Sequence, residues 1–279
     1  MSVITNLEKY NKEPNTVTGG TLYIGTVKIN NLEKDETRKI RIYLPTDYDD
    51  KKRFPVIYMM DGKNLFDKHT SFAGEWGVDE ILEERLNKKE QTYIIVGIDS
   101  ALDGMVRVEE MLPNNNNLTD VDDIKETIPA RGDILGKWIV NELKPEIDNT
   151  FKTLSDKNNT AIAGSSMGGL FSFYMGFKYP EVFNMIFAFS PAFCLYDEKY
   201  FKEEFEKINI KKYDNKLYLL VGDVEYENQF VSLTKYTYNR LLEMGMKKDS
   251  IKYVHDLEGI HHETFWNKYF NDAIKHWEK

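Results

Sequence analysis

Cysteine and long apolar runs are scarce in this sequence. Cys194 is the single cysteine among 279 residues, so no disulfide can form within the chain, as expected in a reducing compartment. No stretch approaches the roughly 18 apolar residues that a membrane-spanning helix requires. The N-terminal residues also lack the charged-then-apolar pattern of a secretory signal. We therefore expect a cytoplasmic protein that does not insert into membranes, in which Cys194 is a small packing residue.

Negative charges outnumber positive ones. Lys and Arg number 37 against 46 Asp and Glu, which gives a net charge of -9. Nucleic acids and anionic membranes require a basic face that replaces their counterions, so neither is expected as the main partner. The sequence also lacks internal repeats and linkers, and its one low-complexity patch, Asn114–Asn117, is too short to join two domains. With 41% hydrophobic and 30% charged residues, residues 1–279 are predicted to form a single globular domain.

The apolar residues that are present predict alternating strands and helices. Two early segments, 21–29 and 38–44, alternate polar with apolar residues and predict half-exposed antiparallel strands at one edge of a sheet. Later apolar runs with little alternation predict strands buried on both faces: residues 54–60, 92–98, 160–163, 185–189, 217–221 and 251–255. Helical patterns separate most of them: residues 76–86, 132–149, 168–179, 227–244 and 263–277. We therefore predict an α/β fold with a mostly parallel sheet of about eight strands and helices on both faces.

Residues 100–131 interrupt this alternation. They have no clear helical or strand period, and they carry Pro113, four asparagines and several acids. A long irregular stretch inside a compact domain is typical of a functional loop or lid, although a solvated excursion is the alternative. We predict a lid or insertion over 100–131, in which residues 101–131 help to shape a substrate pocket.

Residues 164–168 have the pattern G-x-S-x-G, which nominates Ser166 as a nucleophile. In this motif the serine stands on a sharp strand-to-helix turn with strained backbone angles, and small residues beside it avoid collisions with the neighbouring chain. Residues 159–163 are apolar and partly β-branched, as in a buried strand, and 169–179 read as a helix that Pro180 ends. This is the context that the motif demands, and an ordinary Gly/Ser turn is the alternative.

A serine nucleophile needs a histidine as base and usually a carboxylate that orients the histidine. In α/β hydrolases the order along the chain is serine, acid, histidine, with the histidine in a late loop. His261 and His262 stand in such a loop after the last predicted strand. The acid is expected after the preceding strand, because α/β sheets place their sites at the carboxyl ends of strands. Three residues there are candidates: Asp223, Glu225 and Glu227.

An oxyanion hole should come from the amide of Met167, which follows the nucleophile, and from an amide in the loop 61–64 after the third strand. The run of His261, His262 and Glu263 could suggest a metal site. Adjacent histidines point in different directions, however, and the sequence has no H-E-x-x-H motif or cysteine cluster. No metal and no other cofactor is expected to take part in the reaction.

Several further segments have a recognisable pattern. The most specific is 56–67 followed by 72–80, which is similar to a strand, D-G turn and tryptophan-led helix found in one family. The other matching segments are 141–148, 163–169, 190–193 and 259–263 with Trp266. Together these segments, which span most of the chain, resemble the esterase D-like esterase family of α/β hydrolases. Its relatives include enterochelin esterases, feruloyl esterases, S-formylglutathione hydrolases and mycolyltransferases.

The resemblance implies a role for individual residues. The family's nucleophile corresponds to Ser166, and its oxyanion amides correspond to Met167 and to Lys63, the residue after the D-G pair. Trp76 and Phe193 are expected to help shape the substrate pocket, although each could equally be an ordinary core residue.

The acid and the base also follow from the resemblance. A glycine followed three residues later by Asp or Glu selects Glu225 as the acid, with Asp223 in reserve. A histidine five residues before a tryptophan and two before a glutamate selects His261 over His262. Many relatives have asparagine where this chain has His262, so the choice between the two histidines is not fully closed.

The resemblance implies a serine esterase that acts on a small-molecule or oligosaccharide ester through an acyl-enzyme. Two alternatives stay open. An acyltransferase would use the same triad, and a non-catalytic binding protein could use the same scaffold. The identity of the acyl group and alcohol and the oligomeric state are open as well.

Overall fold

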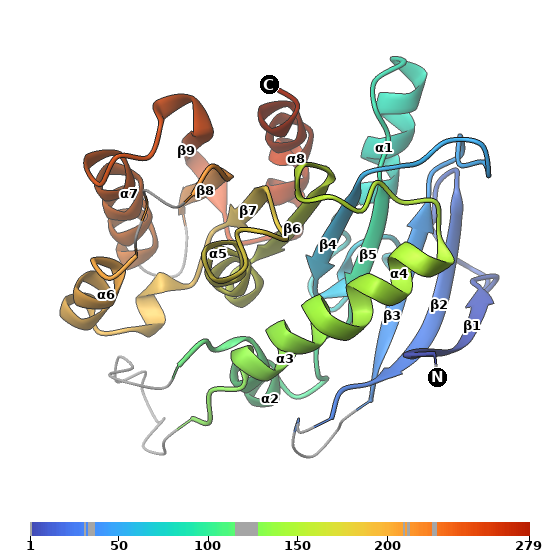
Figure 1. Ribbon diagram of the computed structural model, residues 1–279, viewed down its shortest axis with the longest axis horizontal. Helices are drawn as coiled ribbons and strands as arrows, with labels where there is room; N and C mark the ends of the chain where they lie inside the picture. The colour runs from blue at the N-terminus through green and yellow to red at the C-terminus, as the bar shows by residue number, and fades with distance from the viewer. Residues whose placement is uncertain are drawn as a thin grey trace.

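The structure, a computed structural model, describes residues 2–30, 32, 37–114, 128–208, 210, 213–224 and 228–279. These residues fold around one nine-stranded sheet. The strands lie in the order β1-β2-β3-β5-β4-β6-β7-β8-β9, and Figure 1 shows them in a row with β1 at the right and β9 at the left. Their bounds are β1 Ile4–Lys9, β2 Thr21–Lys28, β3 Thr37–Leu44, β4 Val56–Met60, β5 Ile94–Ile98, β6 Thr160–Ser165, β7 Met185–Phe189, β8 Lys216–Val224 and β9 Ile251–Ile260.

The sheet is mostly parallel, as predicted. Strands β1, β2, β3 and β5 pair antiparallel, and every pair from β5 to β9 is parallel. All eight predicted strands are present. The ninth strand, β1, was not predicted. Only one of its residues, Ile4, is buried and the others are exposed or half-exposed, so its sequence has no apolar pattern typical of a strand. Parallel pairing aligns the carboxyl ends of β4, β6, β7, β8 and β9 along one edge of the sheet, where a site is expected.

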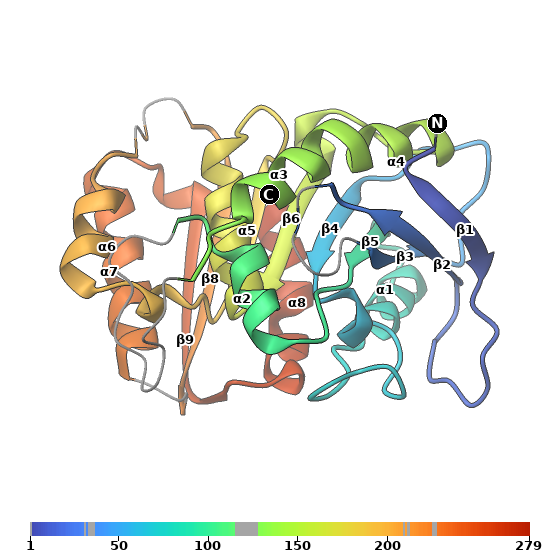
Figure 2. The ribbon, with the colours of Figure 1, turned by 90° about the horizontal axis from the view of Figure 1, so that it is seen from below.

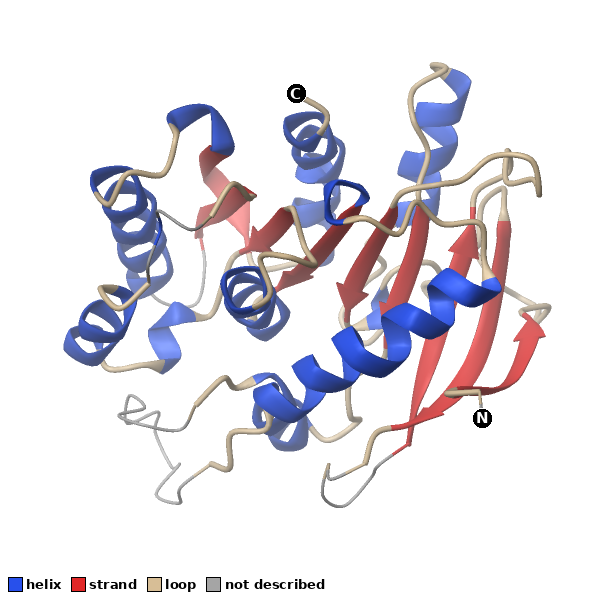
Figure 3. Cartoon of the chain, viewed as in Figure 1, coloured by secondary structure: helices blue, strands red, loops and turns tan. Residues whose placement is uncertain are grey.

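Helices cover both faces of the sheet (Figures 1 and 3). Their bounds are α1 Val78–Asn87, α2 Gly104–Met111, α3 Gly132–Trp138, α4 Lys144–Thr150, α5 Met167–Lys178, α6 Glu198–Phe205, α7 Asn228–Glu243 and α8 Glu263–Trp277. Alternate residues of each central strand face opposite sides. Val56 and Tyr58 of β4 join a core with α2 to α7, whereas Ile57 and Met59 join a second core with α1 and α8.

The helix predicted over 132–149 crosses the sheet as one long element (Figure 2), but it is not uniform. A π-helical turn at Ile139–Leu143 separates α3 from α4. Pro145 follows this turn in the first residues of α4. Because proline has no N–H to donate to the preceding turn, it is a frequent cause of such an irregularity.

Two helices were not expected from the sequence. The first, α2, lies within the segment 100–131, and the Asp103 side chain caps it by accepting hydrogen bonds from Met105 N (2.8 Å) and Val106 N (3.3 Å). The second, α6, is capped by Asp197. Much of the predicted lid, residues 115–127, lies outside the described residues, so the lid stays a prediction. Within the described chain, no helix has both the length and the apolar character needed to cross a bilayer.

Candidate active site

Ser166 connects β6 to α5 in a backbone conformation that few residues adopt. Its φ is 56° and its ψ is -121°, and such angles persist only where the surroundings enforce them. Ser166 N donates to Phe189 O of β7 (3.0 Å), while Ser166 O accepts from Leu170 N (3.0 Å) and Ala192 N (3.1 Å). The strand, elbow and helix predicted around the motif are therefore present, with Ser166 at the carboxyl end of β6.

Close backbone contact explains the glycines of the motif. A Cβ on Gly164 would lie 2.5 Å from both the carbonyl carbon and oxygen of Gly168. A Cβ on Gly168 would in turn lie 3.0 Å from Cβ of Met60 on β4. Larger residues at either position would push α5 away from β6 and disturb the angles of Ser166.

His261 follows β9 and precedes α8, and its half-buried ring lies between two aromatic side chains. The ring centroid is 5.1 Å from that of Phe230 and 5.2 Å from that of Trp266, at interplanar angles of 64° and 86°. Trp266 is itself fixed, because its Nε1 donates to Ser190 Oγ at 3.0 Å. These contacts restrict how the His261 ring can turn.

His262 has a different role in the fold. It is the N-cap of α8, where its Nδ1 lies 3.2 Å from Thr264 N and accepts that hydrogen bond. Its Nε2 lies 2.9 Å from Ala73 O. Both ring nitrogens are thus engaged within the protein, so His262 links the start of α8 to the loop of Ala73.

The acid candidates are only partly described. Glu225 and Glu227 lie outside the described residues, so the assignment of Glu225 stays a prediction. Asp223 is exposed at the end of β8, and its Oδ1 lies 3.0 Å from Nε2 of His255 on β9. Asp223 thus already pairs with a histidine other than His261.

Ser166 and His261 line the same cavity, which has a volume of about 270 Å³. The cavity lies at the carboxyl edge of the parallel strands, the expected place for a site in an α/β sheet. Its other lining residues include Lys63, Phe72, Arg107, Glu263 and Trp266.

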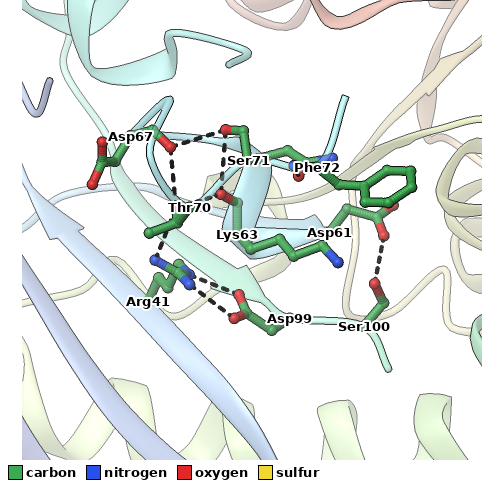
Figure 4. A network of polar contacts seen from close by, with 10 residues as sticks. Arg41, Asp61, Lys63, Asp67, Thr70, Ser71, Phe72, Asp99 and Ser100 are labelled. Carbon is green, nitrogen blue, oxygen red and sulfur yellow. Dashed lines mark hydrogen bonds and ion pairs between the residues drawn. The ribbon is translucent and has the colours of Figure 1, made fainter. Parts of the chain in front are cut away.

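A partly buried ion pair forms one wall of this cavity. Arg107 of α2 binds Asp61 through two hydrogen bonds, from Nε to Oδ1 (2.6 Å) and from a terminal nitrogen to Oδ2 (2.7 Å). Ser100 Oγ also donates to Asp61 Oδ1 at 2.8 Å (Figure 4). Burial would raise the pKa of Asp61, but the Arg107 charge and the hydrogen bonds from Arg107 and Ser100 outweigh it and lower this pKa. The carboxylate therefore stays ionised and holds Arg107 in place.

The sequence did not single out Arg107 as a functional residue. Arg107 belongs to the segment 100–131, which has no clear helical or strand period, so no individual role could be given to it. The one local signal was Asp103, which is a favoured N-cap residue, three positions before Val106 and four before Arg107.

The predicted oxyanion residue Lys63 lies in a short 3-10 turn, Gly62–Asn64, directly after β4. Its carbonyl oxygen accepts a hydrogen bond from Thr70 Oγ1 at 2.7 Å. Its side chain extends toward Phe72 (Figure 4), with Nζ 5.4 Å from the ring centroid. Asn64 secures the same loop, because its Nδ2 donates to Glu263 Oε1 (2.9 Å) and its Oδ1 accepts from Phe72 N (3.0 Å).

The loop also packs tightly on the strand beside it. A Cβ on Gly62 would lie 2.7 Å from the backbone of Gly97 and from Asp99 Oδ1. Arg41 holds Asp99 through hydrogen bonds of 2.8 and 3.0 Å (Figure 4). Gly62 thus allows the loop to lie close against β5. The loop between β4 and α1 is held by this contact on one side and by the bond of Asn64 to Glu263 on the other.

Glu263, the first residue of α8, is a second wall residue that the sequence interpretation gave no role. It is buried, and burial raises its pKa above the usual value despite the hydrogen bond from Asn64. The one sequence feature that pointed to Glu263 was its position two residues after His261, and this spacing was used only to choose between the two histidines.

Trp76 and Phe193, the predicted substrate-binding residues, are both buried and are not among the residues described as lining the Ser166 cavity. Trp76 packs against Trp266 at 5.5 Å between ring centroids, so it supports a lining residue from behind. Phe193 instead lines a second cavity of about 460 Å³, together with Leu170 and Phe173. Contact of either residue with substrate stays a prediction.

Comparison with known proteins gives consistent results. A sequence model of the Esterase family, described as "Putative esterase", matches residues 32–277. The uncharacterized protein YbbA of Bacillus subtilis is 22% identical over 253 residues, which cover 87% of this chain and 93% of YbbA. The crystal structure of BES protein from Bacillus cereus matches with a TM-score of 0.72 at 20% identity, and the match covers 97% of this chain and 99% of the BES chain. The enterobactin esterase FES from Shigella flexneri, solved with 2,3-di-hydroxy-N-benzoyl-glycine, matches with a TM-score of 0.70 at 18% identity. This match covers 95% of this chain and 61% of the FES chain.

The solved structures share the fold, and the family model spans almost the whole chain, including β4, the Ser166 elbow and the loop of His261. The resemblance found in the sequence is thus confirmed. The chain belongs to the family described as "Putative esterase" and is a carboxylic ester hydrolase with an α/β-hydrolase fold.

Proposed function

We propose that the protein is a serine esterase in which Ser166 forms an acyl-enzyme and His261 acts as the base. The observation that carries this proposal is the position of Ser166. Its strained angles at the end of β6 turn it into the cavity that His261 also lines. A backbone strain of this kind is typical of a functional residue, because folding alone gives no reason to retain it.

The proposed reaction has two steps. His261 takes the Ser166 proton as the serine oxygen attacks the ester carbonyl, and the alcohol then leaves with that proton. A water molecule, activated by the same histidine, then releases the acid. The amides of Met167 and Lys63 would stabilise the oxyanion. Both stand in the first turn of a helix, where N–H groups have no acceptor within the helix.

The lining of the cavity supports an ester with an aromatic or otherwise apolar group. Phe72 is 85% exposed at the cavity, so its ring is open to contact with a substrate. The Lys63 ammonium beside its ring adds positive charge, whereas the charge of Arg107 is balanced by Asp61. An acidic or phenolic substituent would therefore fit best on the Lys63 side of the cavity. A small-molecule ester of this type fits the cavity better than a long chain, and an oligosaccharide ester would extend past its rim.

An active-site label tests the proposal directly. A fluorophosphonate probe should attach once per chain, and peptide mass mapping should find it on the peptide that contains Ser166, because only an activated serine reacts readily with such a probe. Heat-denatured protein is the control and should take no label. A label on another residue, or none on protein that hydrolyses p-nitrophenyl acetate, would exclude Ser166 as the nucleophile.

We propose Glu225 as the acid that orients His261, and the alternative is tested by paired variants. Glu225→Gln should lower kcat/KM for p-nitrophenyl acetate by about 10²–10⁴-fold, because the orienting carboxylate stabilises the imidazolium that forms during the reaction. Asp223→Asn should leave it within about threefold, since Asp223 pairs with His255 at the surface. The opposite pattern would make Asp223 the acid.

A further inference from the structure

Three carboxylates gather at the start of α1, outside the cavity described above. Glu75, Asp79 and Glu80 each offer one oxygen atom, and these oxygens all lie within 4.8 Å of one another. The Asp79 side chain is completely buried, and those of Glu75 and Glu80 are half-buried. Like charges held so close and out of water repel each other strongly unless something positive lies between them.

The protein itself supplies too little to balance these charges. Asp79 Oδ2 accepts a hydrogen bond from Thr18 N at 2.6 Å. Asp79 Oδ1 and Glu80 Oε2 are buried and have no partner outside the cluster, and the only hydrogen bond between these two side chains requires one of them to carry a proton. Within the described residues, neither Lys nor Arg forms an ion pair with any of the three carboxylates. Buried polar atoms are almost always satisfied in folded proteins, so these two oxygens share either a cation or a proton.

We propose that Glu75, Asp79 and Glu80 bind a calcium ion. Oxygen-only ligands select a hard cation, and nitrogen or sulfur ligands that would suit zinc or copper are absent from the cluster. Calcium accepts bonds of about 2.3–2.6 Å in flexible geometry, which suits oxygens that lie within 4.8 Å of one another. Magnesium demands a near-ideal octahedron with bonds of about 2.0–2.1 Å and tolerates an irregular ligand set less well.

The neighbouring hydroxyls already hold the carboxylates in position. Thr16 Oγ1 donates to Glu75 Oε1 at 2.9 Å, and Thr18 Oγ1 donates to Glu80 Oε1 at 3.1 Å. A cation between the three carboxylates would favour the ionised form of each of them.

This calcium ion would have a structural role. It would join the N-terminal segment, through Thr16 and Thr18, to the first turn of α1. The same turn is continuous with Trp76, whose backbone N–H donates to Asn64 O at 2.7 Å. The ion would thus brace the loop that carries Lys63, and the ester chemistry at Ser166 would need no metal.

Thermal unfolding with and without calcium is the first test. Protein stripped with EGTA should gain about 5 °C or more in Tm when Ca²⁺ is added to saturation, because an ion that binds only the folded state stabilises it. Mg²⁺ should give a smaller gain. Asp79→Asn and Glu80→Gln should each abolish the gain. Glu84→Gln, on the exposed side of α1 where Glu84 pairs with Lys88, is the matched control and should keep it.

Terbium luminescence reports binding without relying on stability. Tb³⁺ imitates Ca²⁺, and Trp76, next to Glu75 in the chain, can sensitise its emission. The signal should appear with wild-type protein and the Glu84→Gln variant, be displaced by Ca²⁺, and be lost in Asp79→Asn.

A shared proton is the competing explanation for the unpartnered oxygens. In that case Ca²⁺ would leave the Tm of the stripped protein unchanged and terbium would not be sensitised. The Tm would instead fall as the pH rises from about 5 to 8, because a carboxyl whose folded pKa is raised stabilises the fold only while protonated. Asp79→Asn would then remove this fall. Such a result would overturn the calcium site.

Discussion

Replacing Ser166 by alanine should lower kcat/KM for p-nitrophenyl acetate by about 10⁴–10⁶-fold. The variant removes the oxygen that we propose bonds to the acyl group, and no other described serine combines strained backbone angles with a place beside His261 in the cavity. A low level of activity should remain, because backbone amides that stabilise the oxyanion can still favour attack by water.

The fold of this variant is expected to survive. Alanine keeps the backbone hydrogen bonds of Ser166 to Phe189, Leu170 and Ala192, which involve no side-chain atoms. Circular dichroism and the Tm should match wild type within a few degrees. Ser172→Ala, on the same helix but buried in the core, is the matched control and should stay active. Full activity in Ser166→Ala would reject the proposed mechanism outright.

The features that could be predicted from the sequence are those that local sterics determine. The buried apolar runs fixed the central strands, and the two glycines that flank Ser166 are required because Gly164 and Gly168 touch. The α/β-hydrolase order then singled out Ser166 and a late histidine, and parallel strands bring the segments that follow them to one edge of the sheet. These inferences need only short segments and a topology.

The features that could not be predicted depend on contacts between distant segments. The ion pair of Asp61 with Arg107 joins the end of β4 to α2, 46 residues later. Nothing in either segment alone indicates the other. The bond between Asn64 and Glu263 spans 199 residues. A sequence pattern can propose that such polar residues are functional, but only the fold brings them into one cavity.

The same reasoning applies to Trp76. The resemblance implied that it helps to shape the substrate pocket, with an ordinary core residue as the alternative. In the fold the indole packs among Phe189, Trp266 and Phe270, because the second core between α1 and α8 requires large apolar side chains. A tryptophan has the same appearance in a sequence whether it serves a core or a pocket.

Replacing His261 by alanine should have an effect comparable to that of losing Ser166, a loss of about 10³–10⁶-fold in kcat/KM. Without the imidazole, the serine hydroxyl keeps its proton and is a poor nucleophile. The two residues act as a unit, so the double variant Ser166→Ala with His261→Ala should be no slower than either single variant. Losses that multiply would instead indicate two independent roles.

His262→Ala is the control that separates the adjacent histidines. It removes the cap of α8 and the contact with Ala73, so the free energy of unfolding should fall by about 1 kcal/mol. Its kcat/KM should stay within about tenfold of wild type, because the base remains. If His262→Ala abolished turnover while His261→Ala did not, the assignment of the base would reverse. The ring of His261 would then serve only to pack between Phe230 and Trp266.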